Sequence, residues 1–275
     1  MVTSPATLVG SGRPGRHEHL CLAYDEYAQF RAAAHRFLLD GLVRGQQVRH
    51  VTARPAGDPG AELRAAHRGR ADAVEVVTLD ADPERRFDPA ERARAHTAAT
   101  ERALARGFTG LRVATDVTPL VHDAEWLAAL ARYEHLVDRY MVSSPFSALC
   151  GYARSRLGPD EVAQVACLHA GTSPGATPFR LYAAPGATAA LAGEVDLTAA
   201  ELLVTALDRA DLPPVAGRLV LDVSGLTFLD HRGLYALAEH GRRVDATVVL
   251  RDPRPIVRRL VELVPVTGVQ AESRR

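Results

Sequence analysis

The segment LVLDVSGLTFLDHRGL, residues 219–234, contains a strand, a turn and the start of a helix. Residues 219–223 form a short apolar run, which is typical of a buried strand. Asp230 stands just before the apolar positions Leu234 and Leu237, and an aspartate there can accept hydrogen bonds from the free amides of a first helical turn. The segment therefore predicts a strand, a loop and a helix capped by Asp230.

The residues on either side extend this unit into a small α/β domain. Runs at 179–183 and 188–195, separated by Pro185 and Gly186, predict a hairpin. Thr198 with Glu201 three residues later predicts a capping box and a helix, and a further strand and helix follow from 247 to 261. The predicted order is β-β-α-β-α-β-α.

The first half of the chain alternates short apolar runs with amphipathic patterns, which is typical of parallel α/β folds. Strands are predicted at 20–24, 48–52, 74–79, 111–117 and 146–152, and helices between them, the one after the fourth strand carrying Trp126 and Tyr133. The periodicity ends in AGTSPGATP, residues 170–178. We therefore expect a flexible N-terminus at 1–15, a first domain at 16–169, a linker at 170–177 and a second domain at 178–275.

Composition excludes several classes of function. The 275 residues contain 47% apolar side chains, and 33 basic residues balance 33 acidic ones, which argues against a nucleic-acid partner or a polybasic membrane anchor. Lysine and asparagine are both absent, which excludes a P-loop lysine, a Schiff-base lysine and N-glycosylation. The arginine-rich, lysine-free composition is typical of a bacterium with a GC-rich genome.

The chain shows no export or membrane signal. Three cysteines are too few for a secreted disulfide scaffold, and no apolar run approaches the roughly 20 residues that a membrane span needs. We therefore expect a cytoplasmic protein with no membrane partner.

The 219–234 segment resembles the signature of STAS domains, the family of anti-sigma-factor antagonists that also occurs fused to sulfate transporters. The resemblance covers Pro178 to about Gln270. It implies a small α/β domain with a mixed sheet and helices on one side, and a protein partner such as an anti-sigma factor of the histidine-kinase-like ATPase type. It places the partner-binding residues at Asp230, His231, Arg232, Gly233 and Leu234.

The sequence departs from this family at one decisive place. Antagonists carry Asp-Ser-Ser-Gly, whose phosphorylated serine breaks the complex, whereas this chain has Asp230-His231-Arg232-Gly233. We therefore expect no phosphoserine switch of that kind. Ser224 and Thr227 lie nearby as alternative acceptors, although turn hydroxyls that bond to the backbone are the simpler interpretation. His231 and Arg232 are either a basic docking surface or ordinary exposed residues of a first turn.

The first half lacks the glycine-rich loop of a nucleotide-binding domain, because residues 20–24 lead directly into Asp25-Glu26-Tyr27. It is predicted to be a degenerate, RecA-like parallel-sheet domain that does not hydrolyse nucleotide. The pieces HLCLAY (19–24), FLLDGLVRG (37–45), LRVATD (111–116) and LCGY (149–152) are similar to the MEDS sensory domain. This resemblance, over about Arg16 to His169, implies sensing of small hydrocarbon derivatives in signalling.

Three pairs of polar or sulfur-containing residues occur at a spacing of two: His19 with Cys21, Cys150 with Tyr152, and Cys167 with His169. This spacing places each pair on one face of an extended segment. In a parallel sheet the first and fifth strands can be neighbours, so these residues could form a pocket for a metal or a soft small molecule. The alternative is that the thiols are small buried hydrophobes. Asp116 stands either at the ligand edge of the sheet or as a helix cap. The candidate ligand-binding residues are His19, Cys21, Tyr24, Asp116, Cys150, Tyr152, Cys167 and His169.

No enzyme motif accompanies these residues, and no cofactor is predicted. Ser143, Ser144 and Ser147 lack a G-x-S-x-G setting, and Glu134 and His135 are expected to be solvated or at the core edge. We therefore predict a two-domain signalling protein in transcription regulation that is not an enzyme. Two alternatives stay open: a ligand-binding protein whose STAS half drives homo-oligomer formation, and an enzyme that uses the thiol of Cys21 or Cys150.

Overall fold

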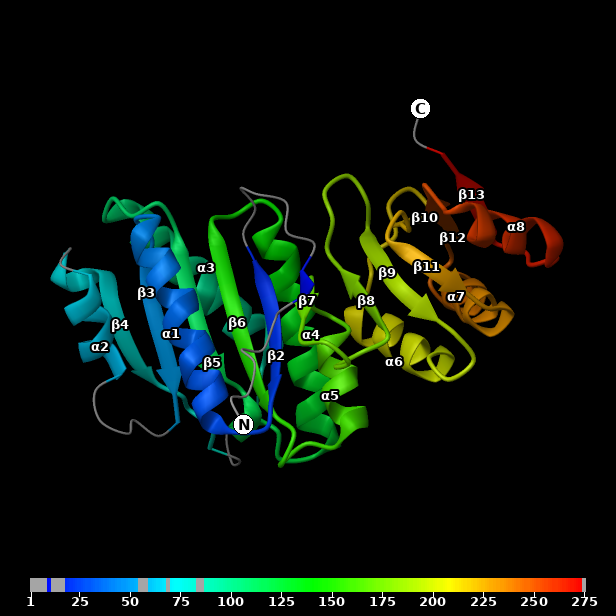
Figure 1. Ribbon diagram of the computed structural model, residues 1–275. Coiled ribbons are helices and arrows are strands. Elements are labelled where there is room, and N and C mark those ends of the chain that lie inside the picture. Colours follow the sequence, from blue (N-terminus) through cyan, green and yellow to red (C-terminus); the bar gives the residue numbers. More distant parts are fainter. Residues whose placement is uncertain (1–8, 11–17, 54–58, 68–69, 83–86, 274–275) are drawn as a thin grey trace.

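The computed structural model describes residues 9–10, 18–53, 59–67, 70–82 and 87–273, which form two α/β units side by side (Figure 1). The sheet of the first unit has seven strands in the order β1-β7-β2-β6-β5-β3-β4, and only β1 runs antiparallel to its neighbour. The strands are β1 (Val9–Gly10), β2 (His19–Tyr24), β3 (Gln47–Thr52), β4 (Val74–Thr78), β5 (Leu111–Asp116), β6 (Phe146–Ala153) and β7 (Gly171–Thr172).

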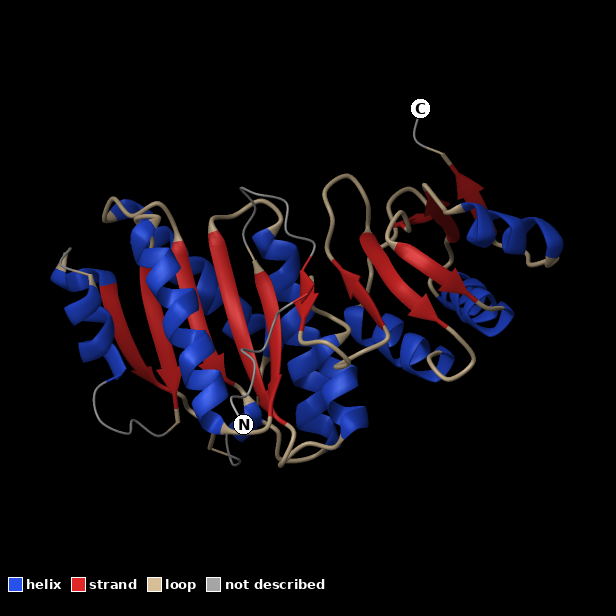
Figure 2. Ribbon diagram, in the orientation of Figure 1, coloured by secondary structure: helices blue, strands red, loops and turns tan. Residues whose placement is uncertain are grey.

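Helices cover both faces of this sheet (Figure 2), which confirms the predicted parallel α/β fold. Helices α1 and α2 pack on one face, while α3 and α4 pack together on the other, next to α5. The helices are α1 (Tyr27–Val43), α2 (Pro59–Ala66), α3 (Pro89–Ala105), α4 (Ala124–Met141) and α5 (Pro159–Ala166), with short 3-10 turns η1 (Ala71–Ala73) and η2 (Thr118–Leu120).

Strands β2 and β6 are direct neighbours, as predicted for the first and fifth apolar runs. Their register pairs Cys21 with Cys150 and Ala23 with Tyr152. Because side chains alternate along a strand, the odd-numbered residues of β2 face α4. Tyr24 points to the opposite face, where its ring lies 5.7 Å from that of Phe30 in α1.

The second unit has a mixed six-stranded sheet, which confirms the predicted mixed α/β fold. Strand β8 pairs antiparallel with β9, as the predicted hairpin requires, and the remaining pairs are parallel. The strands are β8 (Phe179–Tyr182), β9 (Ala189–Val195), β10 (Arg218–Asp222), β11 (Leu226–Leu229), β12 (Thr247–Arg251) and β13 (Val269–Glu272). The helices are α6 (Ala200–Ala210), α7 (His231–Arg243) and α8 (Pro255–Leu263).

One predicted helix cap is confirmed and one is wrong. Asp230 caps α7, because its side chain accepts a 2.8 Å hydrogen bond from the amide of Gly233. Helix α6 begins later than the Thr198 box predicts, and the carboxylate of Asp196 accepts from the amides of Thr198 and Ala199 instead. The hydroxyl of Thr198 does not cap the helix but donates to the same carboxylate at 2.8 Å.

The segment predicted as a linker belongs partly to the first sheet. Gly171–Thr172 forms β7 beside β2, and Ser173 hydrogen-bonds to the backbone of β2 at both Cys21 and Ala23. The predicted flexible N-terminus lies outside the described residues except for Val9–Gly10, which forms β1. The chain thus passes from one unit to the other within a few residues, and α6 packs against α4 and α5.

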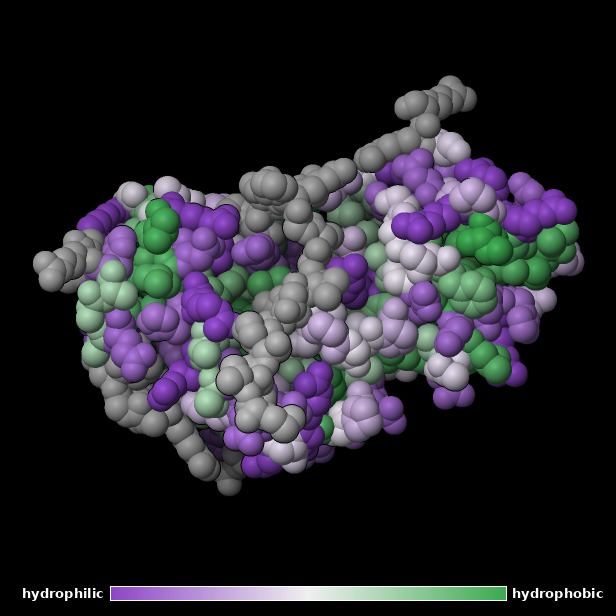
Figure 3. All heavy atoms as spheres, viewed as in Figure 1, coloured by the Kyte–Doolittle hydropathy of each residue, from purple (hydrophilic) through white to green (hydrophobic). Residues whose placement is uncertain are grey.

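Both units expose large apolar side chains. Exposed apolar side chains gather where β11 and α8 of the second unit meet (Figure 3), among them Phe228, Ile256 and Leu263. Within the described ranges, no helix combines the length and apolar character needed to cross a bilayer.

Candidate functional site

Helix α4 carries two carboxylates into the interior of the first unit. Glu134 is 0% exposed and Asp138 is 4% exposed, and both lie on the helix face that packs toward β2 and β6. The expectation that Glu134 and His135 are solvated or at the core edge is wrong, since both are buried. Glu134 lies four residues after Leu130 and four before Asp138, so helical periodicity puts all three on one buried face.

His19 lies between these carboxylates. Its Nδ1 is 3.0 Å from Asp138 Oδ1, and its Nε2 is 3.1 Å from Glu134 Oε2. Burial alone would lower the pKa of His19, but the hydrogen bonds to Asp138 and Glu134 outweigh burial and raise this pKa to about 9. In the absence of any other cation, His19 is therefore protonated and compensates the buried negative charge.

Glu134 is the centre of the cluster. The Tyr152 hydroxyl donates a 2.6 Å hydrogen bond to Oε1, while Cys150 Sγ lies 3.5 Å and His169 Nε2 lies 3.6 Å from Oε2. Burial opposes ionisation, but the neighbouring His169 and the hydrogen bond with His19 lower the pKa of Glu134 to about 2. Glu134 is thus ionised at every physiological pH.

His169 completes the cluster from the turn after α5. It is 0% exposed, its Nδ1 donates to the carbonyl of Val165 at 2.9 Å, and its ring lies 4.0 Å from that of His19. Its Nε2 has no hydrogen-bond partner among the described residues. Burial lowers the pKa of His169 to about 4, so the ring is neutral.

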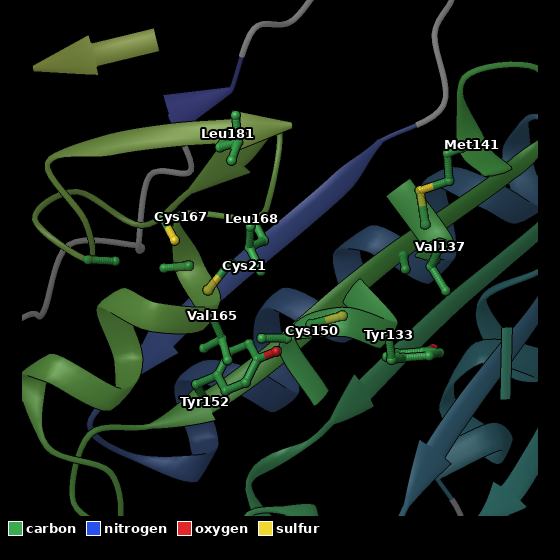
Figure 4. Close-up of a cluster of buried hydrophobic side chains, with 14 of the residues drawn as sticks. Cys21, Tyr133, Val137, Met141, Cys150, Tyr152, Val165, Cys167, Leu168 and Leu181 are labelled. Carbon is green, nitrogen blue, oxygen red and sulfur yellow. The ribbon is translucent and has the colours of Figure 1, made fainter. Parts of the chain in front are cut away.

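The structure brings together four of the eight predicted ligand-binding residues: His19, Cys150, Tyr152 and His169. Cys21 and Cys167 are buried beside them, and in Figure 4 their sulfur atoms lie close together, away from Cys150. Tyr24 and Asp116 lie apart from this group, near the opposite face. Asp116 accepts from the amide of Thr118 at 3.2 Å but is not a helix cap, because the N-cap of η2 is Val117.

The three thiols are not poised for catalysis. Burial raises the pKa of Cys21 and of Cys150 far above the usual range, and it raises the pKa of Cys167 to about 12. A nucleophilic cysteine needs the reverse, an exposed thiol of low pKa. The geometry therefore argues against the thiol-dependent enzyme.

A cavity of about 340 Å³ lies beside the cluster, between strands β3 to β6 and helices α3 and α4. The aromatic rings of Phe87, Trp126 and Tyr133 form much of its wall, and Cys150 lines it as well. Sequence reasoning missed this cavity, although Trp126 and Tyr133 were assigned to one helix face. The cavity suits a small, largely apolar molecule that has one polar end.

The second unit is hydrogen-bonded directly to this site. Asp138, which orients His19, also accepts from the backbone amide of Ala183. The carbonyl of Cys167 accepts from the amide of Leu181 at 2.6 Å, and that of Ala170 accepts from the Arg180 guanidinium. Strand β8 is thus attached to α4 and to the turn that carries His169.

The predicted partner-binding residues divide into two groups. His231 and Arg232 are exposed and Asp230 is partly exposed at the start of α7. Gly233 and Leu234 are buried, so the prediction that they contact a partner is wrong: they pack the helix onto the sheet.

The hydroxyls of Ser224 and Thr227 both donate hydrogen bonds. Ser224 donates to Asp222 at 2.7 Å, and Thr227 donates to the carbonyl of Gly193 at 2.8 Å. Thr227 bonds to the backbone as the simpler interpretation describes, whereas Ser224 bonds to a side-chain carboxylate.

Two protein families match the chain in succession. The MEDS family, described as the methanogen/methylotroph, DcmR sensory domain, matches residues 18–170. A STAS family, described as Mlab, STAS domain, matches residues 183–270. No curated protein matches the chain. The MEDS match covers more than half of the chain and includes every residue of the buried cluster.

Proposed function

Since the chain belongs to the MEDS family of sensory domains and a STAS domain follows it, we propose that this regulatory protein senses a small molecule and reports it to a protein partner. The small molecule would bind in the first unit. The partner would bind to the second unit in the cytoplasm.

The observation that carries this proposal is the shared hydrogen-bonding of the buried site and strand β8. Asp138 belongs to both, because one of its oxygens contacts His19 and the other accepts from Ala183. A ligand that changes the position of α4 or of the Cys167–His169 turn changes the contacts of β8. Two sites joined by such contacts can be coupled by 1–3 kcal/mol, or about 5- to 150-fold in affinity.

We expect the ligand to bind in the cavity beside Cys150. Its aromatic wall favours a small hydrocarbon derivative, in agreement with the class that the MEDS family is proposed to sense. Arg92, whose guanidinium also donates to the carbonyl of Asp80, lines the cavity and offers a partner for a polar or anionic end of the ligand. Arg49 lines the cavity as well but is paired with Glu75 at 2.7 Å.

We expect the partner to bind at the exposed start of α7. His231 and Arg232 give it positive charge, and Phe228 and Tyr235, which are 41% and 51% exposed, give it apolar contact area. Aromatic and arginine side chains contribute most often to the affinity of protein interfaces. The partner we propose is an anti-sigma factor of the histidine-kinase-like ATPase type.

Because no hydroxyl stands at positions 231 and 232, binding at this surface would be controlled from the first unit and not by phosphorylation. Ser224 and Thr227 are already engaged in turns. The double variant His231→Ser/Arg232→Ser rebuilds Asp-Ser-Ser-Gly and tests this point. With partner kinase and ATP, intact-mass analysis should show a phosphate on the variant and none on the native chain.

Binding itself is tested by interferometry with the full chain and the ATPase-type anti-sigma factors encoded in the same genome. His231→Ala/Arg232→Ala should weaken binding at least about 10-fold, which corresponds to 1.4 kcal/mol. Arg242→Ala is the control, an exposed arginine at the other end of α7. Unchanged binding in the variant Asp230→Ala/His231→Ala/Arg232→Ala contradicts the proposal, and self-association measured by ultracentrifugation would then favour the homo-oligomer alternative.

A further inference from the structure

Four buried side chains of the first unit direct a ligand atom toward one point. They are His19 of β2, Glu134 of α4, Cys150 of β6 and His169 of the turn after α5, and their ligand atoms all lie within 4.8 Å of one another. Each comes from a different element, so the fold itself assembles the set.

Both imidazoles are held so that Nε2 faces this point. The Nδ1 of His19 donates to the Asp138 carboxylate and the Nδ1 of His169 donates to the Val165 carbonyl. Histidines that bind metals are oriented in this way, by a carboxylate or a backbone carbonyl on the other nitrogen. Glu134 is oriented likewise, because the hydroxyl of Tyr152 donates to its second oxygen.

Three of the six separations between the four ligand atoms match the edges of a tetrahedral zinc site. Zinc bonds of about 2.0–2.3 Å to nitrogen, oxygen and sulfur give tetrahedral edges of about 3.3–3.6 Å. Around Glu134 Oε2 the observed separations are 3.1 Å to His19 Nε2, 3.5 Å to Cys150 Sγ and 3.6 Å to His169 Nε2.

A proton on His19 does not account for the whole cluster. It would join His19 to Glu134 and Asp138, but the Nε2 of His169, which lies 3.6 Å from Glu134 Oε2 in a fully buried place, still has no hydrogen-bond partner among the described residues. Buried charges in proteins are paired or coordinate metals. A cation bound between these atoms gives His169 Nε2 a partner and offsets the charge of Glu134.

We propose that His19, Glu134, Cys150 and His169 form a tetrahedral binding site for a zinc-type divalent cation. Two imidazoles, one thiolate and one carboxylate are the donor set that zinc prefers. The cavity that reaches Cys150 provides an entry path, with the exposed Asp80 and Glu91 among its outer residues. The site goes beyond the proposed function, since it does not require the second unit to bind any partner.

The metal would also connect to the second unit. Asp138 orients His19 and accepts from Ala183, so the positioning residue of a metal ligand is itself a contact of β8. We expect Asp138→Asn to weaken zinc binding 10- to 100-fold, as loss of such orienting groups does elsewhere.

The test begins with the full native chain, in which elemental analysis should find one zinc per chain after zinc is supplied and excess is removed. With Co²⁺ in place of zinc, the chain should show the visible bands of tetrahedral cobalt and a near-ultraviolet thiolate-to-cobalt band. Cys150→Ala should lose the thiolate band. The matched control is Cys21→Ala, which removes an equally buried thiol at the paired position of β2 and should keep the band.

A second pair of variants distinguishes loss of a metal ligand from loss of the fold. His169→Gln should weaken zinc binding, while His96→Gln, which alters another histidine of the first unit, should not. A folded native chain that takes up neither zinc nor cobalt overturns the proposal, and so does a thiolate band that survives Cys150→Ala. If the native chain binds its partner but no metal, the proposed metal site is wrong and the proposed function stands. If the native chain binds one zinc but no partner, the proposed function is wrong and the metal site stands.

Discussion

Beneath the first sheet, α4 places two carboxylates among histidines, whereas the interior of the second unit is almost entirely apolar. Of the buried polar and charged side chains within the described ranges, His240 alone lies beyond residue 178. His231 and Arg232, the residues of the second unit that we propose bind a partner, are at its surface.

Buried charge is costly, and replacing a buried ion pair by apolar residues is often neutral or stabilising. An interior that keeps His19, Glu134 and Asp138 is therefore not explained by stability. The difference between the units agrees with the proposal that the first one binds a ligand inside and the second one binds a partner at its surface.

The largest effect should come from deleting the centre of the polar cluster. Glu134→Ala leaves the Nε2 of His19 and the hydroxyl of Tyr152 without their acceptor, and removing one partner of a buried pair typically costs about 3–5 kcal/mol. Urea unfolding followed by the fluorescence of Trp126, the only tryptophan, reports on the first unit. Glu125→Ala, at an exposed position of the same helix, is the control and should change the free energy by less than about 0.5 kcal/mol.

This prediction bears on why the sequence revealed only part of the site. The pairs His19-x-Cys21, Cys150-x-Tyr152 and Cys167-x-His169 could be recognised because a strand's alternation puts each pair on one face. Glu134 could not, because a carboxylate on an amphipathic helix is normally solvated. The sequence does show that Glu134 lies four residues from both Leu130 and Asp138, on one face of the helix. That spacing predicts a buried Glu134 only if the buried face of α4 is already known.

The fold was predicted more completely than the site. Apolar runs identified β2 to β6, of which β2 and β6 have side chains buried on both faces, and β8, β9, β10 and β12 of the second sheet. Strand β7 was missed because two residues carry no periodicity, and β11 because the four residues Leu226–Leu229 follow β10 after a short turn. Such strands are determined by pairing with a neighbour, which local sequence does not record.

The next largest effect should be confined to the apolar interior of the second unit. Leu237 of α7 is fully buried, and Leu237→Ala should cost about 3 kcal/mol through lost burial and the cavity left behind. Far-ultraviolet circular dichroism should show the loss while the Trp126 transition keeps its midpoint. Leu263→Ala, at a position 63% exposed in α8, is the control. If both signals shift together, the contacts of β8 with α4 make the two units unfold as one.

Acid should weaken the first unit through the partly buried His96. Burial lowers the pKa of His96 to about 4, and its Nδ1 has no partner in the described part of the chain. The folded pKa lies below the unfolded value of 6.5, so this contribution to stability is present above pH 6.5 and is lost as the pH falls toward 4. Each unit of pKa difference corresponds to about 1.4 kcal/mol of unfolding free energy. Because the ring is only partly buried, we reduce this contribution and expect the free energy of unfolding to fall by about 2 kcal/mol.

The variant His96→Phe keeps an aromatic ring against Phe146, whose centroid lies 5.1 Å from that of His96, and removes the titration. Its free energy of unfolding should fall about 2 kcal/mol less than that of the native chain between pH 6.5 and pH 4. Equal slopes for the two proteins would show that other groups govern the acid response.

The smallest effect on stability should come from the surface of the second unit, and it is the sharpest test of the comparison. Tyr235 is 51% exposed and lies one helical turn after His231, with the two rings 6.2 Å apart. Tyr235→Ala removes little buried area and introduces the best helix former, so the free energy of unfolding should change by less than about 0.5 kcal/mol. If this surface binds the partner, the same substitution should still weaken the complex several-fold, because exposed aromatic side chains supply much of an interface's energy. A stability loss comparable to that of Leu237→Ala would mean that Tyr235 serves the fold, and the division between a binding interior and a binding surface would then fail at this helix.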